Sequence, residues 1–144
     1  MRIDGYWLLC DDGVTRPAFR SAVLGADGNW HPVTFLADSG ADRTALCADD
    51  LQTLGLSPQS TGGGLAGLGG STATVIIQAR IRFIRDTGDA IFVTGTYPAF
   101  TDSATTDISI LGRDITNQFA LIIDRPQDVV CLLGQGHRYT VTAG

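Results

Sequence analysis

Short apolar runs alternate with turn-forming stretches along the first third of the chain. Residues 6–10, 17–24 and 32–37 are rich in Val, Leu, Phe and Trp, and the stretches at 11–13 and 25–29 that separate them are rich in Asp and Gly. Apolar runs of this length between turn residues are typical of β-strands. This part of the chain therefore predicts a meander of strands, the last of which ends at residue 37.

A short helix is predicted after this meander. Residues 48–54 place Leu51 and Leu54 on one helical face, and Gly55 followed by Pro58 provides a stop signal.

Two hairpins are predicted in the middle of the chain. Residues 61–70 read Thr-Gly-Gly-Gly-Leu-Ala-Gly-Leu-Gly-Gly and precede a β-rich run at 71–84. This pattern favours a glycine-rich hairpin with a mobile tip. A second hairpin is expected to join strands at 80–85 and 90–94 through the turn at 86–89.

The last third predicts short elements again. A buried strand is expected at 108–111 and a short helix at 112–118, followed by strands at 119–123 and 129–133. The polar tail at 134–144 is expected to be partly ordered at best. Together these elements predict an all-β fold with one or two short helices.

Composition is consistent with one β-rich domain. The chain has 144 residues, of which 44% are hydrophobic and 17% are charged, and it contains 18 glycines. Because compact domains cluster at about 100–150 residues, residues 1–144 are predicted to form a single domain with a core at about 6–133.

Charge and cysteine content argue against several classes of binding partner. A net charge of −5 argues against nucleic-acid and anionic-membrane partners, which need clustered basic residues. The three cysteines, Cys10, Cys47 and Cys131, lack metal-ligand spacing and are interpreted as buried thiols. No signal-peptide core and no apolar run of about 20 residues is found. The sequence predicts a cytoplasmic protein that binds no metal and no cofactor.

Candidate chemistry begins where the strand at 32–37 ends, at Asp38-Ser39-Gly40-Ala41. A carboxylate directly after a buried strand projects from a rigid support, and a following glycine permits close backbone approach. Hydrolysis by carboxylates needs two acids close enough to share one proton. One such aspartate is therefore half of a site, and a second copy of the chain is needed to complete it.

Four segments in a fixed order resemble the retropepsin-like aspartic peptidases. Residues 35–44 resemble the active-site motif of that family, and Gly64-Leu65-Ala66-Gly67-Leu68-Gly69-Gly70 resembles the tip of its flap, a hairpin that covers the substrate. Residues 108–114 resemble the hydrophobic strand, glycine and helix of the family, and residues 129–133 resemble its closing β-element. The resemblance covers about residues 17–133.

The resemblance implies roles for individual residues. Asp42 and Arg113 would form an ion pair that braces the active-site loop. Arg43 departs from the retroviral members, which often carry an acid there, so their specificity does not carry over. The implied positions are Asp38, Ser39 and Gly40 for catalysis, Ala41, Asp42, Gly67, Leu68, Gly69, Ile108 and Ile110 for substrate binding, and Arg113 and Thr44 for structural support.

The resemblance also implies the fold and the activity. The expected fold is the closed, barrel-like retropepsin fold with a glycine-rich flap. The expected activity is that of an aspartic endopeptidase, a homodimer that hydrolyses peptides or proteins between two copies of Asp38. The alternative is a catalytically inactive retropepsin-like module for peptide binding or dimerisation.

Other motifs are interpreted without catalysis. A second Asp-Thr-Gly at 86–88 follows an arginine and precedes an aspartate between two strands, so it is read as a hairpin turn. The glycine spacing at 62–67 matches a dinucleotide-binding motif but lacks the preceding strand and following helix. His31 and His137 are read as surface residues because Ser39 lacks the nucleophile-elbow pattern of hydrolases.

Overall fold

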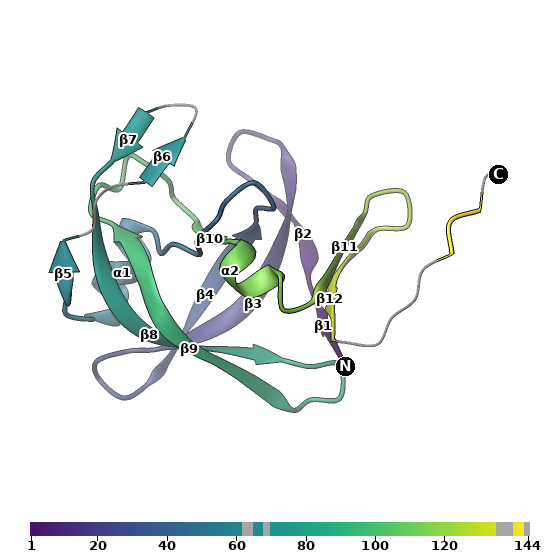
Figure 1. Cartoon of the computed structure of the whole chain (residues 1–144), viewed down its shortest axis with the longest axis horizontal. Helices are drawn as coiled ribbons and strands as arrows, with labels where there is room; N and C mark the ends of the chain where they lie inside the picture. The colour runs from purple at the N-terminus through teal and green to yellow at the C-terminus, as the bar shows by residue number, and fades with distance from the viewer. Residues whose placement is uncertain (62–64, 68–69, 135–139, 143–144) are drawn as a thin grey trace.

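Most of the chain is β-structure (Figure 1). The structure, a computed structural model, describes residues 1–61, 65–67, 70–134 and 140–142. Within these residues the strands form three sheets, and two short helices interrupt them. This arrangement confirms the predicted mostly-β fold with one or two short helices.

The largest sheet contains seven strands. They are β2 (Tyr6–Leu9), β3 (Thr15–Leu24), β4 (Trp30–Ala37), β5 (Ser60–Thr61), β8 (Thr74–Ile84), β9 (Ala90–Phe100) and β10 (Ser109–Leu111). The order is β10-β4-β3-β8-β5, with β2 paired to β3 and β9 paired to β8. The pair β10–β4 is parallel and the other pairs are antiparallel. The predicted meander over the first three of these strands is confirmed.

Strand β9 is longer than the sequence predicts. It was expected to end at Thr94, but its ladder with β8 continues until Phe100 pairs with Thr74. Gly95 and Pro98 lie in this extension and are weak strand formers. Pairing with the long partner strand β8 therefore overrides local propensity here.

A smaller sheet joins the two ends of the chain. It has the order β1 (Arg2–Asp4), β12 (Val129–Leu133) and β11 (Ala120–Asp124). The sequence predicted the last two strands but placed the start of the core at residue 6, and β1 corrects this. Ile3 in β1 is 1% exposed and pairs with Leu132, so the core begins near the N-terminus.

The glycine-rich segment contains a hairpin, as predicted. Strands β6 (Leu65–Gly67) and β7 (Gly70–Thr72) pair antiparallel, with Gly67 opposite Gly70. The predicted site residues Leu68 and Gly69 lie outside the described residues.

Both helices are short. Helix α1 (Ala48–Leu54) has the predicted bounds and ends at Gly55, whose φ of 62° is in the left-handed region that favours glycine. Helix α2 (Arg113–Thr116) is shorter than the predicted 112–118, because the backbone continues as turns in which the N–H of Gln118 donates to the carbonyl of Ile115 at 3.0 Å.

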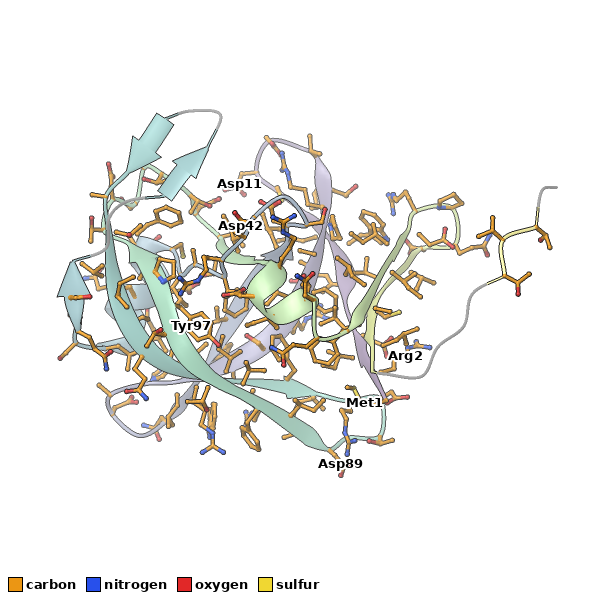
Figure 2. The ribbon with its side chains drawn as sticks, in the orientation of Figure 1. Met1, Arg2, Asp11, Asp42, Asp89 and Tyr97 are labelled. Atoms are coloured by element: carbon orange, nitrogen blue, oxygen red, sulfur yellow. The ribbon has the colours of Figure 1, made fainter. Side chains whose placement is uncertain are left out.

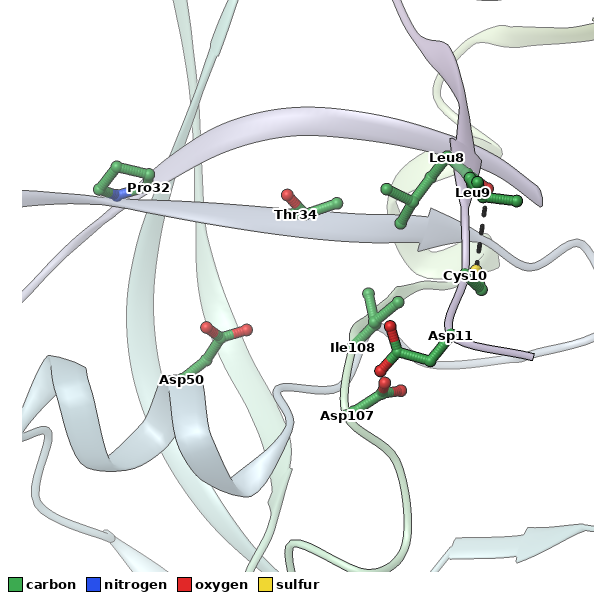
Figure 3. A pocket seen from close by; sticks show the side chains of 9 residues that line it. All are labelled: Leu8, Leu9, Cys10, Asp11, Pro32, Thr34, Asp50, Asp107 and Ile108. Atoms are coloured by element: carbon green, nitrogen blue, oxygen red, sulfur yellow. Dashed lines mark hydrogen bonds between the residues drawn. The ribbon is translucent and has the colours of Figure 1, made fainter. Parts of the chain in front are cut away.

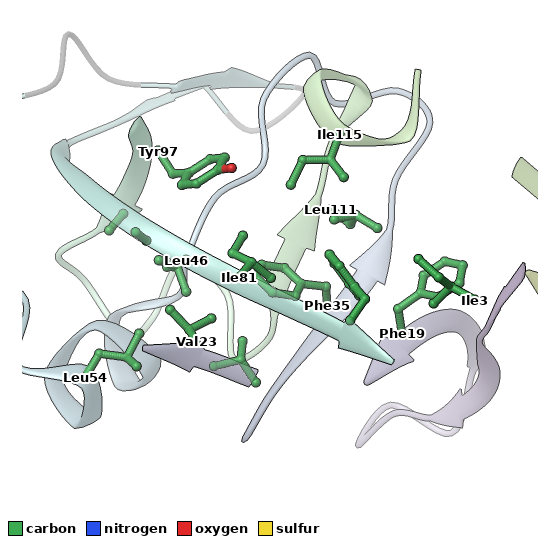
Figure 4. Close-up of a cluster of buried hydrophobic side chains, with 14 of the residues drawn as sticks. Ile3, Phe19, Val23, Phe35, Leu46, Leu54, Ile81, Tyr97, Leu111 and Ile115 are labelled. Carbon is green, nitrogen blue, oxygen red and sulfur yellow. The ribbon is translucent and has the colours of Figure 1, made fainter. Parts of the chain in front are cut away.

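The core lies between the strands and the two helices (Figure 4). Strand β8 shows how alternating apolar and polar residues build this core, because alternate residues of the strand face inward and the residues between them face solvent. Leu54 of α1 and Ile115 of α2 join the same cluster. The largest fully buried side chains are Phe19, Phe35, Phe83, Ile3, Leu46, Leu54, Ile77, Ile81, Leu111, Ile115, Leu132 and Val23.

The cysteines are free in the structure, as interpreted from the sequence. Cys47 and Cys131 are buried and Cys10 is half-buried. Burial raises the pKa of the Cys47 thiol, which favours its neutral form. Within the described part of the chain, no helix has both the length and the apolar character needed to cross a membrane.

Candidate active site

Asp38 lies at the first position after β4. Its N–H donates to the carbonyl of Leu111 at 3.1 Å, so the parallel pair of β4 and β10 supports the start of the turn. The side chain of Asp38 is exposed, as are Ser39 and Gly40. Within the described residues Asp38 has no ion-pair partner. The turn therefore presents an exposed carboxylate from a rigid support.

The turn itself is closed by hydrogen bonds to Asp38. The N–H of Gly40 donates to Asp38 Oδ1 at 3.0 Å, and the N–H of Ala41 donates to the Asp38 carbonyl at 3.2 Å. A Cβ atom at Gly40 would lie 3.3 Å from Asp38 Oδ1, which is tighter than ordinary contact. The absence of a side chain at Gly40 therefore leaves space for the Asp38 carboxylate to accept the hydrogen bond from the N–H of Gly40.

The loop after the turn is attached to α2. The N–H groups of Arg113 and Asp114 donate to the carbonyls of Ala41 and Asp42, at 2.8 and 3.2 Å. The side chains of Asp42 and Arg113 form an ion pair, and Asp42 lies beside α2 in Figure 2. Their side chains are 79% and 48% exposed, so this pair contributes more to orientation than to stability.

Beneath this ion pair lies a buried network around Thr44. Thr44 donates twice to Asp114 Oδ1, from its N–H at 2.9 Å and from its hydroxyl at 2.7 Å. The same hydroxyl accepts from the N–H of Gly112 at 3.0 Å. Thr44 is among the residues that the sequence predicts as structural support, whereas Asp114 is not. Its position in the first turn of a predicted helix was the available signal, since acids there bond to nearby backbone N–H groups.

Arg43 belongs to the same support. Its guanidinium donates to the carbonyl of Thr96 in β9 at 2.8 Å and lies 3.6 Å from Asp114 Oδ2. Neighbouring Tyr97 is buried, and burial followed by the nearby Asp114 carboxylate raises the pKa of Tyr97. Arg43 thus ties the loop at 38–44 to both β9 and α2.

Replacing Thr44 with valine is expected to lower the free energy of unfolding by about 1–3 kcal/mol, because the buried N–H of Gly112 and a partly buried oxygen of Asp114 each lose a hydroxyl partner. Urea unfolding monitored by circular dichroism measures this change. Thr44→Ser keeps the hydroxyl and is the matched control. An equal loss in both variants would assign the effect to packing instead of the hydrogen bonds.

Ile108 and Ile110, which the sequence predicts to line substrate pockets, lie in different surroundings. Ile110 is half-buried and pairs with Leu36 in β4. Ile108 lines a cavity of about 380 Å³ in which Asp38 does not take part (Figure 3). The other residues of its lining are Leu8, Leu9, Cys10, Asp11, Pro32, Thr34, Asp50 and Asp107.

Two motifs, at 86–88 and 62–67, are interpreted from the sequence as non-catalytic. Asp86-Thr87-Gly88 forms the turn between β8 and β9, where the N–H of Gly88 donates to the carbonyl of Arg85 at 2.9 Å and Gly88 has a φ of 90°. This confirms the hairpin interpretation. In the motif at 62–67, Gly67 lies in a strand instead of a helix start, and residues 62–64 lie outside the described residues.

The parts of the candidate site face one side of the molecule. In Figure 1 the β6–β7 hairpin and the loop between β4 and α1 both lie along the upper side of the view. The structure therefore brings the loop at 38–44 together with α2 and places the glycine-rich hairpin on the same side.

Comparison with known proteins supports a retropepsin-like fold for this chain. No protein-family model and no curated protein matches the sequence. Among solved structures, the chain is similar to the EIAV protease complexed with the inhibitor HBY-793, with a TM-score of 0.54 and 25% identity over 71% of this chain and 86% of that chain. It is also similar to a retropepsin-like aspartic protease from Rickettsia conorii, with a TM-score of 0.55 and 21% identity over 92% of this chain and 88% of that chain. The chain has the retropepsin-like fold that the sequence predicted.

Proposed function

We propose that this chain is an aspartic endopeptidase that acts as a homodimer and carries one Asp38 in each subunit. The observation that best supports this proposal is the exposed Asp38 carboxylate, which has no ion-pair partner among the described residues. It is held on a turn that is bonded to Leu111 and braced by α2. The retropepsin-like fold provides the setting in which such a carboxylate serves peptide hydrolysis.

The chemistry follows from two carboxylates at short distance. Like charges disfavour double ionisation, so the pair holds one shared proton. The ionised carboxylate accepts a proton from a water molecule, and the oxygen of that water attacks the peptide carbonyl. The protonated carboxylate donates to the carbonyl oxygen, giving a neutral tetrahedral intermediate. Proton transfer to the amide nitrogen then breaks the C–N bond.

The second carboxylate is proposed to come from a second copy of the chain. An isologous two-fold contact places the same residue of each copy at the axis. Strand β12 cannot make that contact by pairing with a partner strand, because β1 and β11 occupy its edges within the chain. The side of the molecule that carries the Asp38 loop and the β6–β7 hairpin is the proposed contact side. A peptide would lie extended between this loop and the hairpin.

Digestion of a mixed peptide library from acidic to neutral pH tests the proposal. Cleavage is expected to follow a bell-shaped pH profile, because only the singly protonated pair is active. The rate is expected to rise more steeply than the protein concentration at low concentration, since dimers carry the activity. Mass spectrometry identifies the cleaved bonds, and a transition-state analogue with a central hydroxyl is expected to inhibit.

Two results would contradict the proposal. One is the absence of cleavage at every pH by a protein shown to be dimeric, which would favour the non-catalytic peptide-binding module. The other is a rate strictly proportional to concentration for a protein that is monomeric throughout, since one chain provides a single Asp38.

A further inference from the structure

The outer face of the large sheet carries arginine and aromatic side chains at neighbouring positions. Arg82 in β8 pairs with Phe92 in β9 and with Ala22 in β3. Because side chains of a strand alternate between faces, Arg80 shares the face of Arg82. The ring of Trp30 at the start of β4 lies 5.7 Å from the ring of Phe92. Four side chains from three strands therefore meet on the solvent side of the sheet.

These four side chains stack on one another. The guanidinium carbon of Arg80 lies 4.3 Å from the centre of the Phe92 ring, and that of Arg82 lies 4.7 Å from the Trp30 ring. Phe92 is 45% exposed despite these contacts. Each guanidinium covers a ring face, and a guanidinium that stacks in this way can still donate from its terminal N–H groups. Arg82 Nε is buried and has no hydrogen-bond partner among the described residues, so its terminal N–H groups are the ones proposed to bind a ligand.

A third stack extends this face. Arg20 lies two residues from Ala22 on β3, and its guanidinium carbon is 3.9 Å from the ring of Tyr6. The arginine–aromatic face, as defined here, consists of Tyr6, Arg20, Trp30, Arg80, Arg82 and Phe92.

The arginines of this face differ from the other arginines of the chain in their ion pairing. Among the residues that the structure describes, Arg20, Arg80 and Arg82 are the arginines without an ion pair. The aspartates of the nearby turns make other contacts, because Asp27 is bonded to His31 and Asp89 is paired with Arg85. The chain as a whole has a net charge of −5. Unbalanced positive charge is thus concentrated on one face of an acidic protein.

We propose that the arginine–aromatic face docks an acidic segment of a protein partner. Guanidinium groups bind carboxylates through paired N–H groups, and arginine, tryptophan and tyrosine are enriched among residues that dominate protein interfaces. A nucleic acid is a poorer match. Its bases need free ring faces for stacking, and guanidinium groups cover ring faces here, while the acidic remainder of the chain repels a polyanion.

The part of this face formed by Trp30, Arg80, Arg82 and Phe92 is separate from the candidate active site. Strand β4 runs from Trp30 to Ala37 before Asp38, and a strand rises about 3.3 Å per residue, so roughly 20 Å or more separates Trp30 from Asp38. The stack of Arg20 on Tyr6 lies nearer to Asp38, because Arg20 pairs with Thr34 of β4. Docking of an acidic segment on the arginine–aromatic face does not require peptide cleavage. If the peptidase proposal fails, the docking proposal can still be tested, and the reverse is also true.

Binding of a fluorescein-labelled oligoglutamate peptide, measured by fluorescence anisotropy at low salt, tests the proposal. Saturable binding that weakens as salt is added is expected. The double variant Arg80→Gln/Arg82→Gln is expected to bind at least about tenfold more weakly, because two of the three carboxylate-binding groups of the face are lost. Arg125→Gln is the matched control, since Arg125 stacks on Trp7 at 4.7 Å but is paired with Asp128.

The outcomes separate docking from alternatives. Binding that is lost in the double variant and retained in Arg125→Gln supports the proposal. Absence of saturable binding, an equal loss in Arg125→Gln, or tighter binding of an oligothymidylate of the same length overturns it. Arg20→Gln, in the neighbouring stack, is expected to weaken binding less than the double variant does. It provides the same test if the double variant does not fold.

Discussion

Replacing Asp38 with asparagine is expected to abolish peptide cleavage while leaving the fold and the dimer intact. Asparagine has the same shape, and its side-chain oxygen still accepts from the N–H of Gly40. It cannot take up the proton of the attacking water, and general acid–base steps contribute about 10²–10⁴-fold to rates. Initial rates on a cleaved peptide measure the loss. Circular dichroism and size-exclusion chromatography check the fold and the dimer.

The chain contains its own control for this variant. Asp86 begins the second Asp-Thr-Gly, at the turn between β8 and β9, and Asp86→Asn is expected to keep full activity. Substantial cleavage by Asp38→Asn, or loss of cleavage in Asp86→Asn, would show that the catalytic carboxylate has been assigned to the wrong turn.

Mixing experiments extend the same prediction to the dimer. Added Asp38→Asn protein is expected to reduce the activity of the wild-type protein, because mixed dimers contain one carboxylate and one amide. A wild-type rate unchanged by excess variant, under conditions where subunits exchange, would contradict a site shared between subunits. A non-catalytic peptide-binding module predicts that peptide binding survives in Asp38→Asn with no cleavage by either protein.

Local features of this fold were readable from the sequence. Helix α1 has the predicted bounds because a leucine face and Gly55 specify its body and its end. The turn at 86–88 was predictable because Asp and Gly between two apolar runs favour a hairpin. The strand before Asp38 was predictable from its apolar residues and the turn that follows. In each case residues within a few positions of one another determine the structure.

Features that depend on distant contacts were missed. Strand β1 pairs with β12, near the other end of the chain, and three residues give too short a pattern to predict. The extension of β9 depends on pairing with β8, not on its own composition. Asp114 was missed because its role depends on Thr44, which lies 70 positions earlier in the sequence. Periodicity does not encode such pairings.

Gly112→Ala is expected to be the most destabilising of the substitutions considered. The backbone of Gly112 is extended, with a φ of −93° that any residue adopts, so its requirement for glycine is steric. A Cβ atom there would lie 2.3 Å from the carbonyl carbon of Arg43 and 2.6 Å from the N of Thr44. Backbone cannot rotate away as a side chain can. Since overpacking costs about 1–3 kcal/mol and more where backbone must shift, we expect a loss of at least about 3 kcal/mol.

The same clash is expected to reduce activity. The residues that must shift belong to the loop that continues from Asp38, and misplacement by about 1 Å costs about a hundredfold in rate. Urea unfolding and initial rates measure the two effects. Gly88→Ala separates steric from conformational cost, because Gly88 has a φ of 90° but nothing within 4 Å of an added Cβ. It should cost about 1 kcal/mol and leave the rate unchanged. Equal effects of the two substitutions would mean that the contact between Gly112 and the loop does not hold Asp38 in place.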